Sequence, residues 1–185
     1  FDQRQELALE PEALRLLEQY HLDFVRAGAA LTESEQDRMR EINAEMATLQ
    51  TQFSQNVLSE VNDLAIVVDS EEEMTGLDGA LKQAASEEAA ERDLPGKYVI
   101  PLLNTSGQPA LASLQNRAIR QRIYETSLSR GSRGGDFDNR EVLSKVLSLR
   151  AERSALLGFE NHAEFILANQ TAPTVEAVKQ RLAER

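Results

Sequence analysis

Two segments near the start of the chain place apolar side chains at alternating spacings of three and four residues. This spacing lines one face of an α-helix, so it predicts helices over about 11–27 and 32–62. Thr32 and Glu35 have the spacing of a capping box, which marks the start of the second helix. The short link between the two helices favours an antiparallel helical hairpin. The apolar stripes are Leu14, Leu17, His21, Phe24 and Gly28 in the first helix, and Met39, Ile42, Met46, Leu49 and Phe53 in the second.

Two short runs rich in β-branched residues, 64–68 and 97–103, predict strands that pair in a small sheet. Pro101 lies in the second run, and because proline has no N–H to donate to a sheet, it indicates an edge or a bulge. Residues 104–109, after this run, have the composition of a turn.

The remaining segments predict further helices. The acidic stretch 70–92 is only weakly apolar, so we expect an exposed helix there, broken near Gly76 and Gly79. A second stripe, over 142–156, repeats at helical spacing, and we expect it to pack either against the stripe of 39–53 or against a surface outside both. Helices are also predicted at 110–128, from a capping box at Asp138 and Glu141 to Gly158, at 161–168, and from Thr174 onward.

These elements together predict a mainly α fold, a helical bundle with a long antiparallel helical hairpin and a small two-stranded β element. We interpret residues 1–185 as one helical domain that is part of a longer protein. The reason is that the chain starts at Phe1 rather than at a methionine and stops in a helix that has just begun.

The chain is acidic, with a formal net charge of −11 over 185 residues. Binding to nucleic acid or to an anionic membrane needs an excess of Lys and Arg, so this balance argues against both. There is no cysteine, which excludes disulfides and thiolate ligands and fits a reducing compartment. No apolar run approaches the ~18 residues of a membrane span and no signal peptide is visible, so we expect a cytoplasmic protein.

A catalytic zinc site would need two imidazoles on one helix face and a carboxylate, as in His-Glu-x-x-His. The chain has two histidines, His21 and His162, and the residues four positions after them are Val25 and Ile166. Neither histidine therefore forms the required pair, and a buried, hydrogen-bonded His21 is the simpler interpretation. With no cysteine and no Gly-x-Ser-x-Gly elbow either, we predict no catalytic, cofactor-binding or metal-binding residue in this chain.

One stretch departs from the acidic balance: residues 115–133 hold five arginines and a single acid, Glu125. The simplest interpretation is a face whose charges pair within the molecule. A second is a channel-facing surface that attracts peptide carboxylates. A third is nucleic-acid binding, although only Tyr124 is present to stack on a base. The glycines of 131–135 lack the Gly-Lys-Ser/Thr ending of a phosphate loop and predict a flexible link between helices. The arginines are Arg117, Arg120, Arg122, Arg130 and Arg133.

Several segments resemble, in the same order, stretches of one enzyme family. Residues 149–159 read Leu-Arg-Ala-Glu-Arg-Ser-Ala-Leu-Leu-Gly-Phe, which is similar to a Leu-Arg-x-Glu-x-Ala-x-Leu-Leu-Gly-Tyr stretch. Residues 127–135 with Asp138-Asn139 resemble an Arg-Gly…Asp-Asn link. This series resembles the thimet oligopeptidase-like (M3) zinc metallopeptidases, and within them most the bacterial peptidyl-dipeptidases. The other segments that carry the resemblance are 16–29, 42–43 with 53–58, 98–109 and 161–164.

The resemblance implies a much longer enzyme with a neurolysin-like N-terminal helical region. In that family the helical region helps to wall a deep channel, and a later region carries His-Glu-x-x-His and a further Glu ligand. Zinc activates water there, the motif Glu acts as base, and peptidyl-dipeptidases release C-terminal dipeptides from short peptides. No position of this chain matches a ligand or the base, so the expected zinc belongs to the C-terminal catalytic part, the expected partner of this region. The alternative is a non-enzymatic helical protein-interaction module.

Overall fold

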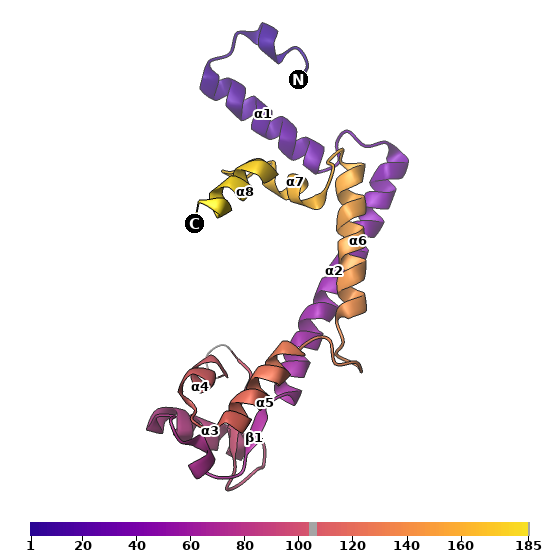
Figure 1. The fold of residues 1–185 in the computed structure, drawn as a ribbon. Helices are drawn as coiled ribbons and strands as arrows, with labels where there is room; N and C mark the ends of the chain where they lie inside the picture. The colour runs from indigo at the N-terminus through magenta and orange to yellow at the C-terminus, as the bar shows by residue number, and fades with distance from the viewer. Residues whose placement is uncertain (104–106, 185) are drawn as a thin grey trace. The chain divides into compact units, whose positions relative to one another are not determined.

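The computed structural model describes residues 1–103 and 107–184, and the fold is mainly α, as predicted (Figure 1). The chain divides into two compact units: Phe1–Gln50 with Ser144–Arg185, and Thr51–Leu143. The elements are η1 (Arg4–Leu7), α1 (Pro11–Arg26), α2 (Glu33–Asp63), β1 (Ile66–Val68), η2 (Glu72–Met74), α3 (Gly79–Glu91), β2 (Tyr98–Ile100), α4 (Gly107–Ser113), α5 (Arg117–Leu128), α6 (Arg140–Leu156), α7 (His162–Leu167) and α8 (Val175–Ala183).

The capping box predicted at the start of α2 is confirmed. The backbone N–H of Thr32 donates to Oε2 of Glu35 at 2.8 Å, and the N–H of Glu35 donates to Oγ1 of Thr32 at 3.4 Å. The hydrogen bond from the Thr32 backbone is the main reason why the pKa of Glu35 lies below its usual range. Two of the N–H groups that a helix start leaves unpaired are thereby satisfied, which fixes where the 31-residue helix begins.

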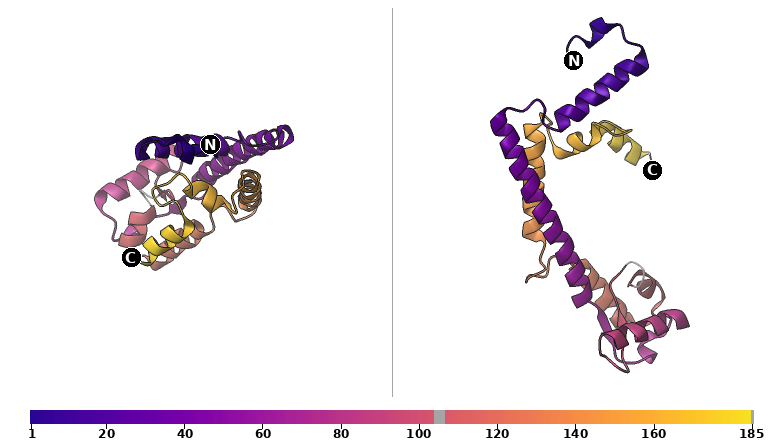
Figure 2. Two further views of the ribbon diagram at one scale, coloured as in Figure 1. Left: turned by 90° about the horizontal axis from the view of Figure 1, so that it is seen from above. Right: turned by 180° about the vertical axis from the view of Figure 1, so that it is seen from behind.

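In the first unit, the stripes of α2 and α6 pack against each other, which was one of the two arrangements expected. The two helices lie side by side (Figures 1 and 2). Arg38 on α2 forms a forked ion pair with Glu152 on α6, with nitrogen–oxygen distances of 2.6 and 2.8 Å. The buried apolar residues along these helices in this unit are Met39, Ile42, Met46 and Leu49 on α2, and Val146 and Leu149 on α6.

Helix α1, the first arm of the predicted hairpin, has the predicted bounds but contains no buried residue. His21 on this helix stacks on the ring of Phe1, with centroids 3.5 Å apart. Leu16, Tyr20 and Phe24, spaced by four residues and so on one face, are all more than half exposed. Leu14 and Leu17 of the predicted stripe are half-buried. An amphipathic helix gains most of its stability by burying its apolar face, and the face of α1 that carries Leu16, Tyr20 and Phe24 is left largely uncovered by the described residues.

The second unit contains the predicted two-stranded antiparallel sheet. Ile66 lies opposite Ile100 and Val68 opposite Tyr98. Helix α3 packs on β2, and α5 contacts β1. Pro101 follows directly after β2, where its missing N–H costs the sheet no hydrogen bond. The core of this unit consists of Leu64, Ile66, Val68, Met74, Leu77, Ala85, Ile100, Leu102, Ala110, Leu114, Ile119 and Ile123.

The expectation of an exposed helix within 70–92 was wrong. Helix α3 covers the sheet, and Ala85 and Ala89 are 5% and 1% exposed. Alanine has too little apolar surface to give a strong periodic signal, yet its small side chain allows a helix to approach a sheet closely. The sequence pattern therefore understated how well this helix is buried.

The single helix predicted over 110–128 is instead two helices, α4 and α5. Asn116 ends the continuity, because its side-chain Oδ1 accepts the N–H groups of Ala118 and Ile119 and so caps α5. The N–H of Gln115 donates to the carbonyl of Thr75 at 2.8 Å rather than into a helix. The turn predicted at 104–109 falls partly on residues 104–106, which lie outside the described residues, and α4 already begins at Gly107.

Gly76 lies in the turn that contacts the end of α4, and it also makes the break between α4 and α5 possible. Its φ is +100°, a conformation that favours glycine, and a Cβ placed on it would lie 2.1 Å from the carbonyl oxygen of Ser113. The backbone at the end of α4 can approach this turn only because no side chain is present.

We predict that Ile42→Ala will lower the free energy of unfolding by about 2–5 kcal/mol, because the side chain is fully buried and its loss leaves a cavity. Leu147→Ala, at an exposed position on α6, is the control and should change it by about 0.5 kcal/mol or less. Urea denaturation followed by circular dichroism measures both. Equal losses for the two variants would contradict the assignment of Ile42 to the core.

The Arg38–Glu152 pair predicts a pH-dependent stability. The hydrogen bond from Arg38 lowers the pKa of Glu152, so the pair contributes stability above the usual carboxyl pKa and loses it as the pH falls through the lowered value. The stability difference between wild type and Arg38→Met should be largest near neutral pH and shrink below about pH 4. Denaturation at several pH values tests this, with Arg40→Met, which removes only a pair with Asp37 inside α2, as the control. A difference that does not change with pH would contradict the prediction.

Candidate functional site

The two histidines lie on different helices and do not converge. His21 is on α1 beside Phe1, and His162 is the first residue of α7, with its ring 6.0 Å from that of Phe165. Across residues 1–103 and 107–184, no three His, Asp or Glu side chains come together in a group that could hold a metal ion. The side chains of this part of the chain therefore do not fit a zinc site of the His-Glu-x-x-His kind.

Three of the five clustered arginines bind backbone carbonyl oxygens inside the second unit. Arg120 donates to the carbonyls of Leu114 and Gln115, at 2.5 and 2.9 Å, and so pairs groups left open by the break between α4 and α5. Arg122 reaches the carbonyl of Val67 at 3.3 Å. The third, Arg130, donates to the carbonyl of Leu102 at 3.1 Å. The arginines thus act within the molecule as expected, but their main acceptors are neutral carbonyls rather than carboxylates.

The ion pair that does form in this stretch involves Glu60 of α2, which is 3% exposed. Its Oε1 accepts Nε of Arg133 at 3.1 Å, and its Oε2 accepts the backbone N–H of Gly131 at 2.5 Å. Arg133 also donates to Asp63 at 3.0 Å, and hydrogen bonds to Asp63 and Glu60 raise the pKa of Arg133. A buried carboxylate is costly unless it is hydrogen-bonded and paired, and here both conditions are met.

Asn139, 4% exposed, fixes the other end of the same loop. Its backbone N–H donates to the carbonyl of Gly131 at 2.9 Å, which closes residues 131–139 into a ring. Its side-chain Nδ2 donates to the carbonyl of Phe53 at 3.2 Å, and its Oδ1 accepts from Asn56 at 3.0 Å. We call residues 131–139 the closed loop; both of its ends are held on α2.

Asp138 sets the start of α6 next to this loop. It accepts the backbone N–H of Arg140 at 2.9 Å and that of Gly134 at 2.7 Å. The side-chain hydrogen bond from Arg140 is the main cause that holds the pKa of Asp138 well below its usual range. The segment predicted to be a flexible link is therefore an ordered structure, held by contacts that local composition does not reveal.

A hollow of about 400 Å³ lies beside the closed loop. Its buried polar groups, Glu60 and Asn139, are already paired with protein atoms. Its apolar walls are partly exposed, at Phe53, Val57 and Leu143. The hollow thus offers hydrophobic contact but no free group for proton transfer.

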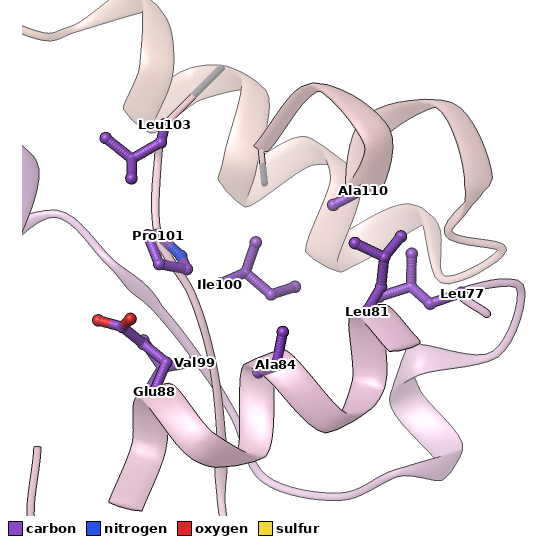
Figure 3. A pocket seen from close by; sticks show the side chains of 10 residues that line it. Leu77, Leu81, Ala84, Glu88, Val99, Ile100, Pro101, Leu103 and Ala110 are labelled. Atoms are coloured by element: carbon purple, nitrogen blue, oxygen red, sulfur yellow. The ribbon is translucent and has the colours of Figure 1, made fainter. Parts of the chain in front are cut away.

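A second, more apolar pocket of about 230 Å³ lies between α3, β2 and the start of α4 (Figure 3). Glu88 is its one charged lining residue, and its carboxylate is engaged by Arg92 at 2.7 Å. This pocket therefore also offers apolar contacts but no free group for catalysis. The other lining residues are Leu77, Leu81, Ala84, Ala85, Val99, Ile100, Pro101, Leu103 and Ala110.

Sequence reasoning missed Glu60, and it named Asn139 only as part of the resemblance, without a structural role. Glu60 stands in a polar stretch of a long helix, where acidic residues are common, and nothing local marks it as buried. The Arg-Gly…Asp-Asn spelling of the link was a signal for Asn139, but its role depends on α2, some 80 residues earlier in the chain.

We predict that Glu60→Ala will lower the free energy of unfolding by about 1.5–3 kcal/mol, because it leaves the Gly131 N–H and Arg133 without their shared acceptor. The control Asp63→Ala removes the exposed partner of the same arginine and should cost about 1 kcal/mol or less. Chemical denaturation gives both values, and hydrogen exchange at Gly131 should speed up in the first variant alone. Similar losses in the two variants would show that the buried carboxylate does not organise the loop.

Comparison with known proteins places these segments in a family context. Residues 110–185 match the model of Peptidase family M3. The chain is 37% identical over 177 residues to dipeptidyl carboxypeptidase of Salmonella typhimurium and 35% identical over 177 residues to that of Escherichia coli, covering 96% of this chain in each case. It is 34% identical over 175 residues to the probable cytosolic oligopeptidase A of Arabidopsis thaliana, covering 91% of the chain and 24% of that relative. The predicted resemblance to M3 peptidases is confirmed.

The chain spans about a quarter of the length of these relatives, 26% for both bacterial dipeptidyl carboxypeptidases. The similarity therefore extends over nearly the whole chain but over a minor part of each relative. Within the described residues, no helix is both long enough and apolar enough to cross a membrane.

Proposed function

We propose that this chain, which is similar to M3 peptidases over nearly its whole length, is the non-catalytic N-terminal helical region of a longer zinc metallopeptidase. In this proposal the full protein hydrolyses short peptides in the cytoplasm and releases C-terminal dipeptides, with zinc held by residues outside this chain. One observation carries the proposal: 96% of the chain aligns with bacterial dipeptidyl carboxypeptidases, of which it spans 26%. The similarity to a probable cytosolic oligopeptidase A of Arabidopsis thaliana supports the cytoplasmic location.

The direction of the polar contacts supports an architectural role, as part of the wall of a substrate channel. Glu60, Asn139 and Arg130 are used to join segments of the chain to one another. By contrast, the exposed side chains of Tyr20 and Phe24 on α1 are large and apolar, as expected of a surface that another part of a protein covers. A channel wall needs internal hydrogen bonds that hold its own segments together, and an exposed surface that contacts the rest of the protein.

The alternative is a non-enzymatic helical module that binds another protein through α1. The amphipathic α1, with no buried residue, supports it equally well. The reading frame that encodes this chain discriminates the two. A His-Glu-x-x-His helix a few hundred residues downstream supports the peptidase, whereas a stop codon soon after residue 185 supports the module.

Nucleic-acid binding through the arginine stretch is the remaining alternative. The intramolecular hydrogen bonds of Arg120, Arg122 and Arg130 leave less of the stretch available to phosphates than its composition suggests. A filter-binding assay at low salt should therefore show no retention of DNA or RNA.

The proposal predicts different behaviour for the chain alone and for the full protein. The purified chain should bind no stoichiometric zinc and should not cleave a short unstructured peptide. The full protein should bind one zinc and release dipeptides from the C-terminus of the same peptide. Metal analysis and mass spectrometry of the products measure both.

Zinc-dependent hydrolysis by the chain alone would overturn the assignment of catalysis to another region. Release of single amino acids by the full protein would overturn the assignment to dipeptide release while leaving a peptidase in place.

A further inference from the structure

Three helices of the first unit bring two arginines and a histidine together around one aromatic ring. We call Arg26 of α1, Arg153 of α6 and His162 of α7 the cationic cluster; because the pKa of His162 is lowered, the positive charge at neutral pH comes from the two arginines. The guanidinium carbons of Arg26 and Arg153 lie 4.1 and 4.9 Å from the centroid of the Phe165 ring. The imidazole of His162 stacks on the same ring at 6.0 Å, and Arg26 also donates to the backbone carbonyl of Phe165.

The charged groups that act on the cluster are themselves positive. Burial is the main reason why the pKa of Arg153 is lowered, and the charges of Arg150 and Arg26 lower it further. Burial likewise lowers the pKa of His162, with Arg150 and Arg153 adding to the effect. No carboxylate of the described residues contributes to the pKa shift of Arg153 or of His162, although the chain carries a net charge of −11.

Two acids close to the cluster in sequence have other hydrogen-bond partners. Glu152, next to Arg153, turns to α2 and forms the forked pair with Arg38. Glu164, next to Phe165, accepts the backbone N–H of Glu160 at 3.2 Å. Neither of these two acids acts on Arg153 or His162.

Two polar atoms of the cluster are buried and have no hydrogen-bond partner in the part of the chain that the structure describes. They are Nε of Arg153 and Nδ1 of His162. Unpaired buried polar atoms are rare in folded proteins, because each has given up its hydrogen bonds to water without replacement. Two in one cluster, beside uncompensated positive charge, indicate that an acceptor with negative charge belongs there.

We propose that Arg26, Arg153 and His162 bind a carboxylate of an acidic side chain, on a segment of the longer protein that packs over α1, α6 and α7. A carboxylate fits because its two oxygens can accept hydrogen bonds from a guanidinium and an imidazole at once. A segment of the same protein is the occupant because about three quarters of the length of the aligned relatives has no counterpart here. This inference rests on the proposed function.

The chain alone tests the chemistry of the site, with acetate as the probe for an acidic side chain. Acetate should shift the side-chain NMR signals of Arg153 and His162 in a saturable way, while sodium chloride at equal ionic strength should not. Arg153→Met should weaken acetate binding about tenfold or more, as expected for the loss of a charge-assisted hydrogen bond. The control Arg117→Met, at an exposed position on α5, should leave it unchanged.

Arg153→Lys separates charge from geometry, because lysine keeps the charge but lacks the fork of the guanidinium. Acetate affinity in this variant should fall between wild type and Arg153→Met. Saturable binding of inorganic phosphate without acetate binding would overturn the proposal in favour of a phosphate site. Shifts that follow ionic strength alone would overturn any anion site.

The full protein tests the source of the carboxylate. In the chain alone, Arg153→Met removes both the repulsion among like charges and the contact with the Phe165 ring, and its effect on the melting temperature there is the reference value. In the full protein the same variant also strands the partner carboxylate and should lower the melting temperature by more than this reference. An equal effect in both would overturn the inference while leaving the peptidase assignment intact, and a full protein without peptidase activity would overturn that assignment alone.

Discussion

A carboxylate removed from water must find donors, and in the second unit this requirement determines where the chain goes after α5. Glu60 is held inside by the N–H of Gly131 and by Arg133, and the loop that supplies these donors is closed by Asn139. The next helix, α6, can begin only where this loop ends. If Glu60 were apolar, the two donors would lack an acceptor and the loop would lose the contact that ties it to α2. These buried hydrogen bonds thus set where α6 starts. The apolar stripe of α6 in turn belongs to the core of the first unit.

Much of the secondary structure could be read from the sequence because its causes are local. The box of Thr32 and Glu35 lies within one helical turn, and the β-branched run ending at Val68 has the composition typical of a half-buried strand. The break between α4 and α5 could not be read in this way. It depends on Gln115 bonding to Thr75, and on the missing side chain of Gly76. A contact between residues 40 positions apart leaves no periodic trace in either segment.

The same distinction explains what could be learned about function. Counting charges predicted that the arginine stretch acts within the molecule, but it suggested carboxylates as partners. Arg120, Arg122 and Arg130 bind carbonyl oxygens, which every residue carries and which composition therefore cannot reveal. The cationic cluster escaped notice for a related reason, since Arg26 and Arg153 are far apart in the sequence and meet only at the ring of Phe165. The family resemblance came from the order of several segments and from no catalytic group.

The two kinds of arginine site differ in a way that bears on the role of the chain. In the second unit, four of the five clustered arginines, Arg120, Arg122, Arg130 and Arg133, find acceptors within the chain. In the first unit, Arg153 is brought beside Arg26 and His162 without an acid, at a cost that the rest of the unit must outweigh. The contact with the Phe165 ring gives Arg153 a role in the fold, but it neither provides an acceptor for Nε nor offsets the like charge of Arg26. An interface does explain the arrangement: like charges that repel in the separate chain become favourable when a carboxylate is placed between them, so the same residues that weaken the isolated unit would strengthen its attachment.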